Sequence, residues 1–301
     1  MAMNILVVGS VAFDAVKTPF GAVERMLGGS ATYFSLAASF FAGLRVVAVV
    51  GDDFTDAEMA VFREKNISTA GLERAPGRTF FWSGEYTDNL NDRVTLDTQL
   101  NVFADFQPKI PAEYRDSELL FLGNIDPELQ RNVQAQLSAP RLVAGDTMNF
   151  WIQGKPEALR RTLGGLHVLV INDGEARLLS GEYNLPAAAR SIHAMGPRIL
   201  VIKRGEYGAL LFVDGKVFCA PGFLLEQVCD PTGAGDSFAG GFMGALAEAG
   251  GFDQAALRRA MIYGSVLGSF AVERFGVERL RRLTRQEIDA RYCAVQDLVR
   301  F

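Results

Sequence analysis

The residues most suited to chemistry lie between Asp230 and Asp236, where the order is Asp-Pro-Thr-Gly-Ala-Gly-Asp. Gly233 and Gly235 permit backbone angles that turn successive N–H groups to one side, with no side chain to block an approaching group. A helix rich in small residues is expected to begin at about Asp236 and run to Ala249, with its positive end facing the same space. The stretch therefore predicts an anion site with a carboxylate beside it.

A carboxylate next to an anion site is unfavourable for passive phosphate binding, because it repels the ligand. It is suitable where a hydroxyl must lose a proton while it attacks a phosphoryl group whose charge the N–H groups stabilise. The same residues also suit an ordinary capped helix start, with Asp236 as a first-turn acid and the glycines as a tight turn. Taken alone, the stretch leaves both interpretations open.

The stretch resembles the second signature of the PfkB/ribokinase family of carbohydrate and nucleoside kinases, Asp-Thr-Thr-Gly-Ala-Gly-Asp, with Pro231 in place of a threonine. In that family the last aspartate is the general base and the Gly-Ala-Gly amides form the anion hole. The resemblance implies these roles for Asp236 and for the amides of Gly233, Ala234 and Gly235.

The resemblance extends to segments that bind the acceptor in the family, Gly9 to Asp14 and the glycine pair that opens a helix running to about Phe41. The first signature departs from its usual form, because Tyr33 stands where asparagine is common and Ser30 where ribokinases proper carry lysine. A ribose specificity is therefore not carried over. The residues assigned to the acceptor are Asp14, Gly28, Gly29 and Asn124.

Two further segments are assigned to the nucleotide. The run Asn172-Asp173-Gly174-Glu175 suits a helix cap with a first-turn acid, and it also resembles the family's Asn-x-x-Glu motif, which holds a Mg²⁺–phosphate water network. Magnesium keeps several waters, so a sparse acidic motif is adequate. The expected ATP contacts are Asn172, Lys203, Gly205 and Gly208, with Glu175 holding Mg²⁺ through water and Asp230 as a candidate K⁺ ligand.

The elements that position these residues follow a regular alternation of strands and helices. Short continuous apolar runs alternate with helical segments, which predicts a mainly parallel sheet buried on both faces. The predicted strands are 4–8, 45–50, 118–122, 141–144, 168–171 and 199–202, with 209–213 and 216–220 following. The resemblance implies an α/β, ribokinase-like three-layer sandwich that forms a single domain over residues 1–301.

From Gly77 the alternation of strands and helices ends. A small antiparallel flap is predicted there, with strands at 78–86, 93–96 and 101–103 around a polar turn at 88–91. The resemblance implies a β-lid from about 78 to 105, with part of 11–25, over the substrate and available for contact with a second copy. Phe80, Phe81 and Trp82 suit covering a sugar or stacking on a base. The plainer interpretation, that they pack the lid, is favoured for at least two of them.

Bulk properties exclude several classes. A chain of 301 residues with 49% hydrophobic residues buries a large core, and a formal charge of −5 argues against nucleic acid or an anionic membrane as partner. Two histidines give little support to a His-based metal site or a Ser-His-Asp hydrolase. Three widely spaced cysteines, no signal peptide at the start given and no membrane-length apolar run favour a soluble, cytoplasmic protein.

The sequence therefore predicts an ATP-dependent phosphotransferase that uses Mg²⁺, with K⁺ as a candidate activator, to phosphorylate a hydroxyl of a sugar. A nucleoside kinase of the adenosine or cytidine type is the alternative, favoured if the aromatic lid stacks on a base. A catalytically inactive, ligand-binding homologue is the alternative from another class. Trp151 stands where the family's Asp-x-Asn-x-Arg segment has arginine, which disfavours a phosphorylated acceptor. A homodimer formed through the lid is also expected.

Overall fold

A computed structural model describes residues 3–87, 89–91 and 93–300. Its main sheet has nine strands, parallel from β11 to β5, with β12 and β13 added antiparallel at one edge. The order across the sheet is β13 (Lys216–Ala220), β12 (Ala209–Val213), β11 (Ile199–Lys203), β10 (Val168–Asn172), β9 (Leu142–Gly145), β8 (Leu119–Leu122), β1 (Ile5–Val8), β4 (Leu44–Val50) and β5 (Ser68–Arg74).

The eight strands predicted for this sheet are present, and the sequence analysis missed β5. That strand lies at the sheet's edge with a largely polar, half-exposed sequence, so it lacks the continuous apolar run by which the buried strands were recognised.

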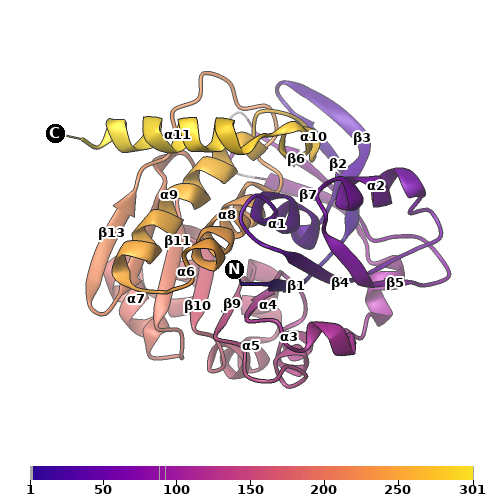
Figure 1. Ribbon diagram of the computed structural model, residues 1–301, viewed down its shortest axis with the longest axis horizontal. Coiled ribbons are helices and arrows are strands. Elements are labelled where there is room, and N and C mark those ends of the chain that lie inside the picture. Colours follow the sequence, from indigo (N-terminus) through magenta and orange to yellow (C-terminus); the bar gives the residue numbers. More distant parts are fainter. Residues whose placement is uncertain (1–2, 88, 92, 301) are drawn as a thin grey trace.

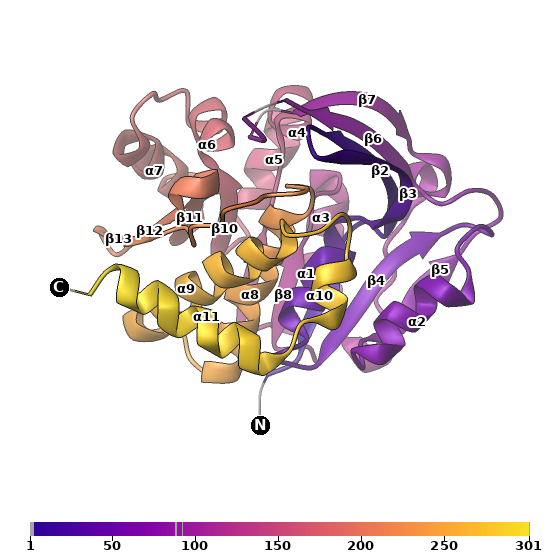
Figure 2. The ribbon, with the colours of Figure 1, turned by 90° about the horizontal axis from the view of Figure 1, so that it is seen from above.

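Helices cover both faces of the sheet and make a three-layer sandwich (Figures 1 and 2). One face carries α1 (Ser30–Ala38), α8 (Ala234–Ala249), α9 (Gln254–Ala271), α10 (Glu278–Arg282) and α11 (Arg285–Leu298). The other carries α3 (Pro127–Gln134), α4 (Asn149–Gly154), α5 (Pro156–Leu163), α6 (Asp173–Ser180) and α7 (Leu185–His193), while α2 (Asp56–Glu64) lies beside β5.

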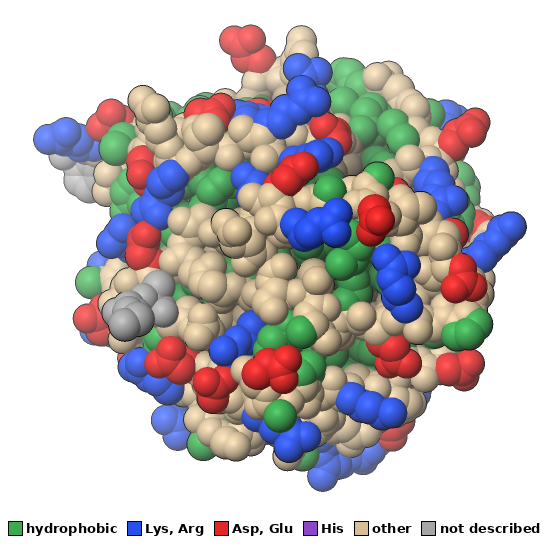
Figure 3. All heavy atoms as spheres, turned by 45° about the vertical axis from the view of Figure 1, so that its right-hand side comes forward, with side chains coloured by type: hydrophobic (Ala, Val, Ile, Leu, Met, Phe, Trp, Pro, Cys, Tyr) green, Lys and Arg blue, Asp and Glu red, His purple; other side chains and the backbone are tan. Residues whose placement is uncertain are grey.

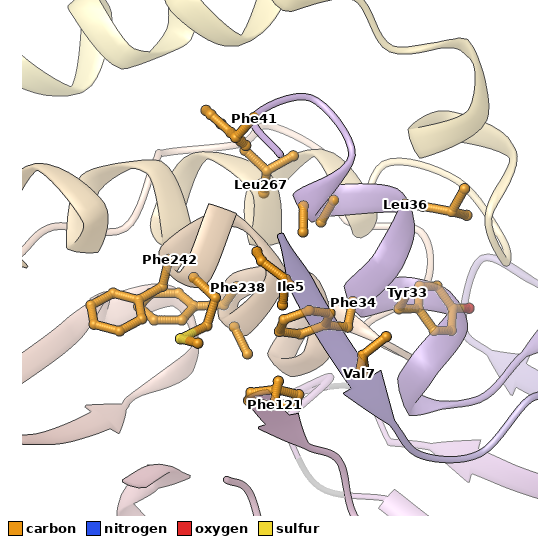
Figure 4. Close-up of a cluster of buried hydrophobic side chains, with 14 of the residues drawn as sticks. Ile5, Val7, Tyr33, Phe34, Leu36, Phe41, Phe121, Phe238, Phe242 and Leu267 are labelled. Carbon is orange, nitrogen blue, oxygen red and sulfur yellow. The ribbon is translucent and has the colours of Figure 1, made fainter. Parts of the chain in front are cut away.

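Strand residues alternate between two apolar clusters, as the two-residue period of a strand requires. Ile5 and Val7 belong to the cluster under α1, α8 and α9 (Figure 4), whereas Leu6 and Val8 belong to the cluster on the opposite face. Helix α8 packs very closely on α1, since a Cβ added at Gly240 would lie 2.3 Å from the Phe34 carbonyl oxygen. This close packing fixes where α8 begins, and the central motif lies there.

A second sheet of four strands, hereafter the lid, has the order β3 (Gly21–Gly28), β2 (Ala12–Thr18), β6 (Phe81–Tyr86) and β7 (Arg93–Gln99). The prediction of a purely antiparallel flap is wrong, because β2 pairs with β6 in parallel. The two strands are joined through the main sheet and not by a tight turn, which permits parallel pairing. The predicted turn begins at Asp88, which lies outside the described residues.

The strand predicted at 101–103 is also wrong, because Asn101–Asp105 forms a 3₁₀ helix, η1. Short apolar runs do not distinguish strand from helix by their period. Phe103 of this helix stacks on Phe80, with ring centroids 5.3 Å apart, so it anchors the lid's first residues. The two other 3₁₀ helices in the described chain are η2 (Ala112–Tyr114) and η3 (Gly205–Tyr207).

On the face seen in Figure 3, positively and negatively charged side chains are interspersed. Strand β7 is exposed along its whole length, including the apolar Val94 and Leu96. Among the described helices, none combines the length and apolar character needed to cross a bilayer.

Candidate active site

The central motif forms the entry to α8. Gly233 is the N-cap in a left-handed conformation with φ 73°, and the helix begins at Ala234, two residues earlier than predicted. Asp236 is therefore the third residue of the helix, beside its positive end. The glycine is required here by its positive φ.

The amides at this helix start are only partly free. Within the described chain, the N–H groups of Gly233, Gly235 and Asp236 have no backbone acceptor, whereas the Ala234 N–H donates to the Pro231 carbonyl at 3.2 Å. The expectation for Ala234 is thus corrected, because a turn that closes just before the helix engages its amide. The N–H of Asp236 is a free donor as well, although it was not predicted to be part of the anion site.

The Asp236 carboxylate is half-buried and forms no hydrogen bond with the described residues. Burial, followed by the charge of Asp146, raises its pKa to about 7, and the charges of Lys203 and Arg93 act in the opposite direction. A carboxylate with a pKa near neutrality is matched to proton abstraction from an alcohol.

Asp14, on β2, lies directly against the paired glycines. A Cβ added at Gly28 would be 1.9 Å from Asp14 Oδ2, so only glycine leaves room for this carboxylate. Burial, together with the charges of Asp230 and Asp236, raises the pKa of Asp14 to about 7, and a hydrogen bond from the Gly29 backbone acts in the opposite direction. The predicted acceptor residues Asp14, Gly28 and Gly29 are therefore in one place, within electrostatic reach of Asp236.

Asn124 follows β8 and is held by two neighbours from the next loop. Its Oδ1 accepts a hydrogen bond from Trp151 Nε1 at 2.9 Å, and its Nδ2 donates to Met148 Sδ at 2.8 Å. The residue that replaces the family's arginine therefore orients Asn124. Contact between Asn124 and an acceptor stays a prediction.

On the other side of the site, Asn172 and Lys203 are register partners at the carboxyl ends of β10 and β11. The Lys203 ammonium is 3.8 Å from Asp146 Oδ2 and 2.8 Å from the position of a Cβ on Gly235, so it reaches from the sheet to the central motif. Burial acts to lower the pKa of Lys203, but the charges of Asp146, Glu175 and Asp236 outweigh burial and raise it. Lys203 is therefore a permanent cation beside the free amides.

Asn172 and Glu175 form the capping box of α6. The Asn172 side chain accepts from the Glu175 N–H and the Glu175 carboxylate accepts from the Asn172 N–H, both at 2.7 Å. The structural interpretation of this motif is thus confirmed. Burial, followed by the charge of Asp146, raises the pKa of Glu175 to about 7. One of its oxygens remains for a water network, so the magnesium role stays a prediction.

The two glycines assigned to ATP have different surroundings. A Cβ added at Gly208 would lie 2.1 Å from the Ala220 carbonyl oxygen, so this glycine is explained by backbone packing. A Cβ at Gly205 would lie 2.5 Å from Asn91 Oδ1, which places the end of the lid hairpin against the predicted nucleotide loop. A contact of either glycine with ATP stays a prediction.

Asp230, the candidate K⁺ ligand, connects two loops. Its Oδ1 accepts from the Thr232 N–H at 2.9 Å and its Oδ2 from the Gly276 N–H at 3.2 Å, and burial raises its pKa. Among the residues that the structure describes, no group of three or more His, Cys, Asp or Glu side chains is arranged to hold a metal ion. The carboxylate thus has a structural role, and K⁺ binding stays a prediction.

The sequence analysis missed Arg93. This residue pairs with Tyr86 across β6 and β7. The Arg93 charge acts to lower the pKa values of carboxylates on both sides of the site, namely Asp14, Asp146, Glu175 and Asp236. Pairing the predicted strands about their polar turn would have indicated that Arg93 and Tyr86 are neighbours.

Of the three aromatic residues at the start of the lid, two pack internally. Phe80 stacks on Phe103, and Phe81 packs against the main apolar cluster, as the plainer interpretation expected. Trp82 is the register partner of Asp14, lies half-exposed across Gly84, and donates from Nε1 to Thr95 Oγ1 at 3.3 Å. Its ring is therefore fixed over Gly84 within the lid, while its backbone lies beside that of the predicted acceptor residue.

A family model described as pfkB family carbohydrate kinase matches residues 3–281. A cytidine kinase from Thermococcus kodakarensis is 29% identical over 249 residues, covering 80% of this chain and 87% of its own. An inositol 3-kinase from Oryza sativa subsp. japonica is 29% identical over 292 residues, covering 90% and 69%. The solved structure of a ribokinase from Thermotoga maritima superposes with a TM-score of 0.77 at 24% identity, covering 97% of this chain and 99% of its own, which confirms the predicted fold.

Proposed function

The chain belongs to the PfkB family of carbohydrate kinases, and from this premise we propose that it transfers the γ-phosphoryl group of ATP to a hydroxyl of a nucleoside. One observation carries the proposal. A half-buried carboxylate, Asp236, has a pKa of about 7 and lies beside free amides and the Lys203 ammonium at the start of α8. A base and an anion site side by side are what proton abstraction coupled to phosphoryl transfer requires.

Each charged group then has a role in the phosphoryl transfer. Asp236 accepts the proton of the attacking hydroxyl while the free amides of Gly233, Gly235 and Asp236 stabilise the transferring charge. Lys203 on the main sheet and Arg93 on the lid offset the negative charge of the phosphates. Asp14 orients the acceptor by accepting hydrogen bonds from its hydroxyls.

The donor set also suits a divalent cation. Asp146 and Glu175 lie close enough to influence each other's charge and offer the hard carboxylate oxygens that Mg²⁺ prefers, and their number is adequate for an ion that keeps several waters. When bound, Mg²⁺ offsets the charge of the nucleotide phosphates.

The nucleoside acceptor is favoured over the sugar by two observations. The relative from T. kodakarensis is a cytidine kinase, and Trp82, the register partner of Asp14, offers a half-exposed indole on the lid. A base stacked on an aromatic side chain gains about 1–3 kcal/mol. A sugar or polyol remains the second candidate, supported by the relative that is an inositol 3-kinase. The presence of Asp236, Lys203 and free amides together argues against a catalytically inactive homologue.

The direct test is a screen of acceptors with MgATP, following ADP release. Cytidine, adenosine and inosine form the nucleoside set, and D-ribose, D-fructose and myo-inositol form the second set. We expect at least tenfold higher kcat/KM for a nucleoside than for any member of the second set. Faster turnover of a sugar or polyol would reverse the acceptor assignment, and an absence of ADP release with all six would leave a ligand-binding role.

Two expectations, activation by K⁺ through the Asp230 region and a homodimer formed through the lid, remain predictions. The exposed Val94 and Leu96 of β7 are compatible with the second.

A further inference from the structure

Tyr33 is the residue by which this chain departs from the family's first signature, and it lies against the central motif. It is the fourth residue of α1, with only 1% of its surface exposed. A Cβ added at Gly233 would be 2.3–2.4 Å from Cγ, Cδ1 and Cδ2 of the Tyr33 ring. The ring therefore packs directly on the turn that leads into the free amides of α8.

The hydroxyl of Tyr33 has no hydrogen-bond partner among the described residues, although it is fully buried. In Figure 4 the ring lies at the border of the apolar cluster, and its oxygen points away from Phe34 and Val7. A buried polar group without a partner costs about 1–3 kcal/mol. Other buried hydroxyls, such as that of Ser35, also lack a partner. Tyr33 differs from Ser35 because its ring packs on Gly233 in the central motif and the charges of Asp14 and Asp236 act on it, so a ligand at the site is a candidate partner for its hydroxyl.

The surroundings of this hydroxyl indicate what ligand it suits. After burial, the charges of Asp14 and Asp230 are the largest influences that raise its pKa well above the usual value, followed by Tyr86 and Asp236. The phenol is therefore a neutral donor within electrostatic reach of several carboxylates, which only accept hydrogen bonds when ionised. An alcohol of a ligand complements this arrangement, because it donates its proton to a carboxylate and still has lone pairs that need a donor.

We propose that Tyr33 determines acceptor specificity. Its hydroxyl donates a hydrogen bond to the oxygen of one acceptor hydroxyl, and that same hydroxyl donates its own proton in a hydrogen bond to Asp14. The Tyr33 ring supports the Gly233 turn. The inference rests on the proposed kinase function and identifies which acceptors are preferred. A site that pairs a specific hydroxyl discriminates against the analogue that lacks it, since its own polar groups are then left unpaired.

The test compares wild type with Tyr33→Phe, which removes the hydroxyl and retains the ring on Gly233. The probes are cytidine with its 2′-deoxy and 3′-deoxy analogues, and D-ribose with 2-deoxy-D-ribose as the sugar pair. In wild type we expect one deoxy analogue to lose roughly tenfold or more in kcat/KM, the value of one hydrogen bond. In Tyr33→Phe the preference for the parent acceptor over that deoxy analogue is expected to disappear, because the KM for the parent acceptor rises about tenfold. The kcat and the KM for ATP are expected to stay within twofold of wild type.

Ser35→Ala is the matched control, because Ser35 is also fully buried on α1 with an unpartnered hydroxyl. This control is expected to keep the wild-type discrimination, and neither variant is expected to lower the Tm of the free protein. If wild type is active but Tyr33→Phe retains its acceptor KM and its discrimination, the inference is wrong while the kinase proposal stands. If wild type releases no ADP with these probes or with any of the six acceptors of the screen above, the kinase proposal fails, and this inference fails with it.

Discussion

Asp14 and Asp236 are two carboxylates that the folded chain holds with pKa values of about 7, mainly through burial and partly through repulsion from other carboxylates, Asp230 and Asp236 in the case of Asp14 and Asp146 in the case of Asp236. Near neutrality, a carboxylate of this kind accepts a proton far more readily than an exposed one. The cost of burial is moderated by cations, with Lys203 and Arg93 near Asp236. The chemistry of the site thus depends on a balance of charge that single substitutions disturb in predictable directions.

The pH dependence of activity follows from the raised pKa of Asp236. Asp236 must be unprotonated to act as the base, and Asp14 must be ionised to accept the acceptor's hydrogen bonds, so kcat/KM should rise at least about tenfold per pH unit below about pH 7 and become constant above it. Steady-state rates between pH 5 and 9, with a coupling assay corrected at each pH, measure this. A profile already constant from pH 5 would contradict a base with a raised pKa.

Gly28→Ala tests the position of Asp14. The added methyl group would overlap Asp14 Oδ2, which must move and lose its alignment with the acceptor. We expect the KM for the acceptor to rise roughly tenfold or more, because one or two hydrogen bonds to Asp14 are lost, while the KM for ATP stays unchanged. Gly154→Ala is the control, since a Cβ at Gly154 meets nothing within 4 Å. Equal effects of the two substitutions would remove Asp14 from the acceptor site.

At the scale of elements, the lid and the body meet at the central motif. The Thr18 hydroxyl of β2 donates to the Cys229 carbonyl at 3.0 Å, and the Thr232 hydroxyl donates to the Tyr86 hydroxyl of β6 at 3.3 Å. The lid also contacts the predicted nucleotide loop, where Asn91 lies against Gly205. A single sheet thus borders both the acceptor residues and the nucleotide residues, and the charge of Arg93 on this sheet acts on the carboxylates of the site.

Arg93→Gln tests whether the lid contributes charge to the reaction. Loss of the arginine removes an influence that lowers the pKa of Asp236, so the midpoint of the pH–rate profile should move to higher pH and kcat should fall roughly tenfold. Lys17→Gln is the control, because Lys17 is an exposed lid cation paired with Glu85 at 2.7 Å. An unchanged midpoint in Arg93→Gln would show that the lid arginine does not act on the base.

Elements were predicted from sequence most reliably where burial dictates the pattern. The continuous apolar runs of the central strands and the capping boxes at Thr55 and Asn172 identified their elements directly. The edge strand β5, the parallel β2–β6 pair and the 3₁₀ helix η1 were missed because tertiary packing decides them. For the same reason Arg93 and the packing of Tyr33 on Gly233 became apparent only from the structure.

For the whole molecule, the raised carboxylate pKa values predict a pH-dependent stability. Asp14, Glu175 and Asp236 have pKa values of about 7 in the folded state and ordinary values near 4 when unfolded, so the folded state binds more protons between pH 4 and 7. Their contribution to stability is complete below about pH 4 and is lost as pH rises through 7. His167, whose pKa burial lowers, acts in the opposite direction as a single group.

We therefore expect the Tm of the ligand-free protein to fall by about 5 °C or more between pH 5 and pH 8, measured by calorimetry in matched ionic strength. Asp236→Asn, which removes one titrating group, should reduce this fall. A Tm that rises over the same range would contradict the raised pKa values.

The carboxylate at the start of α8 is the proposed general base, and Asp236→Asn removes it while MgATP binding and turnover are measured on the same sample. We expect ATP affinity within a few fold of wild type and turnover lowered by roughly a hundredfold or more. Turnover close to wild type with the folded, ATP-binding variant would contradict it.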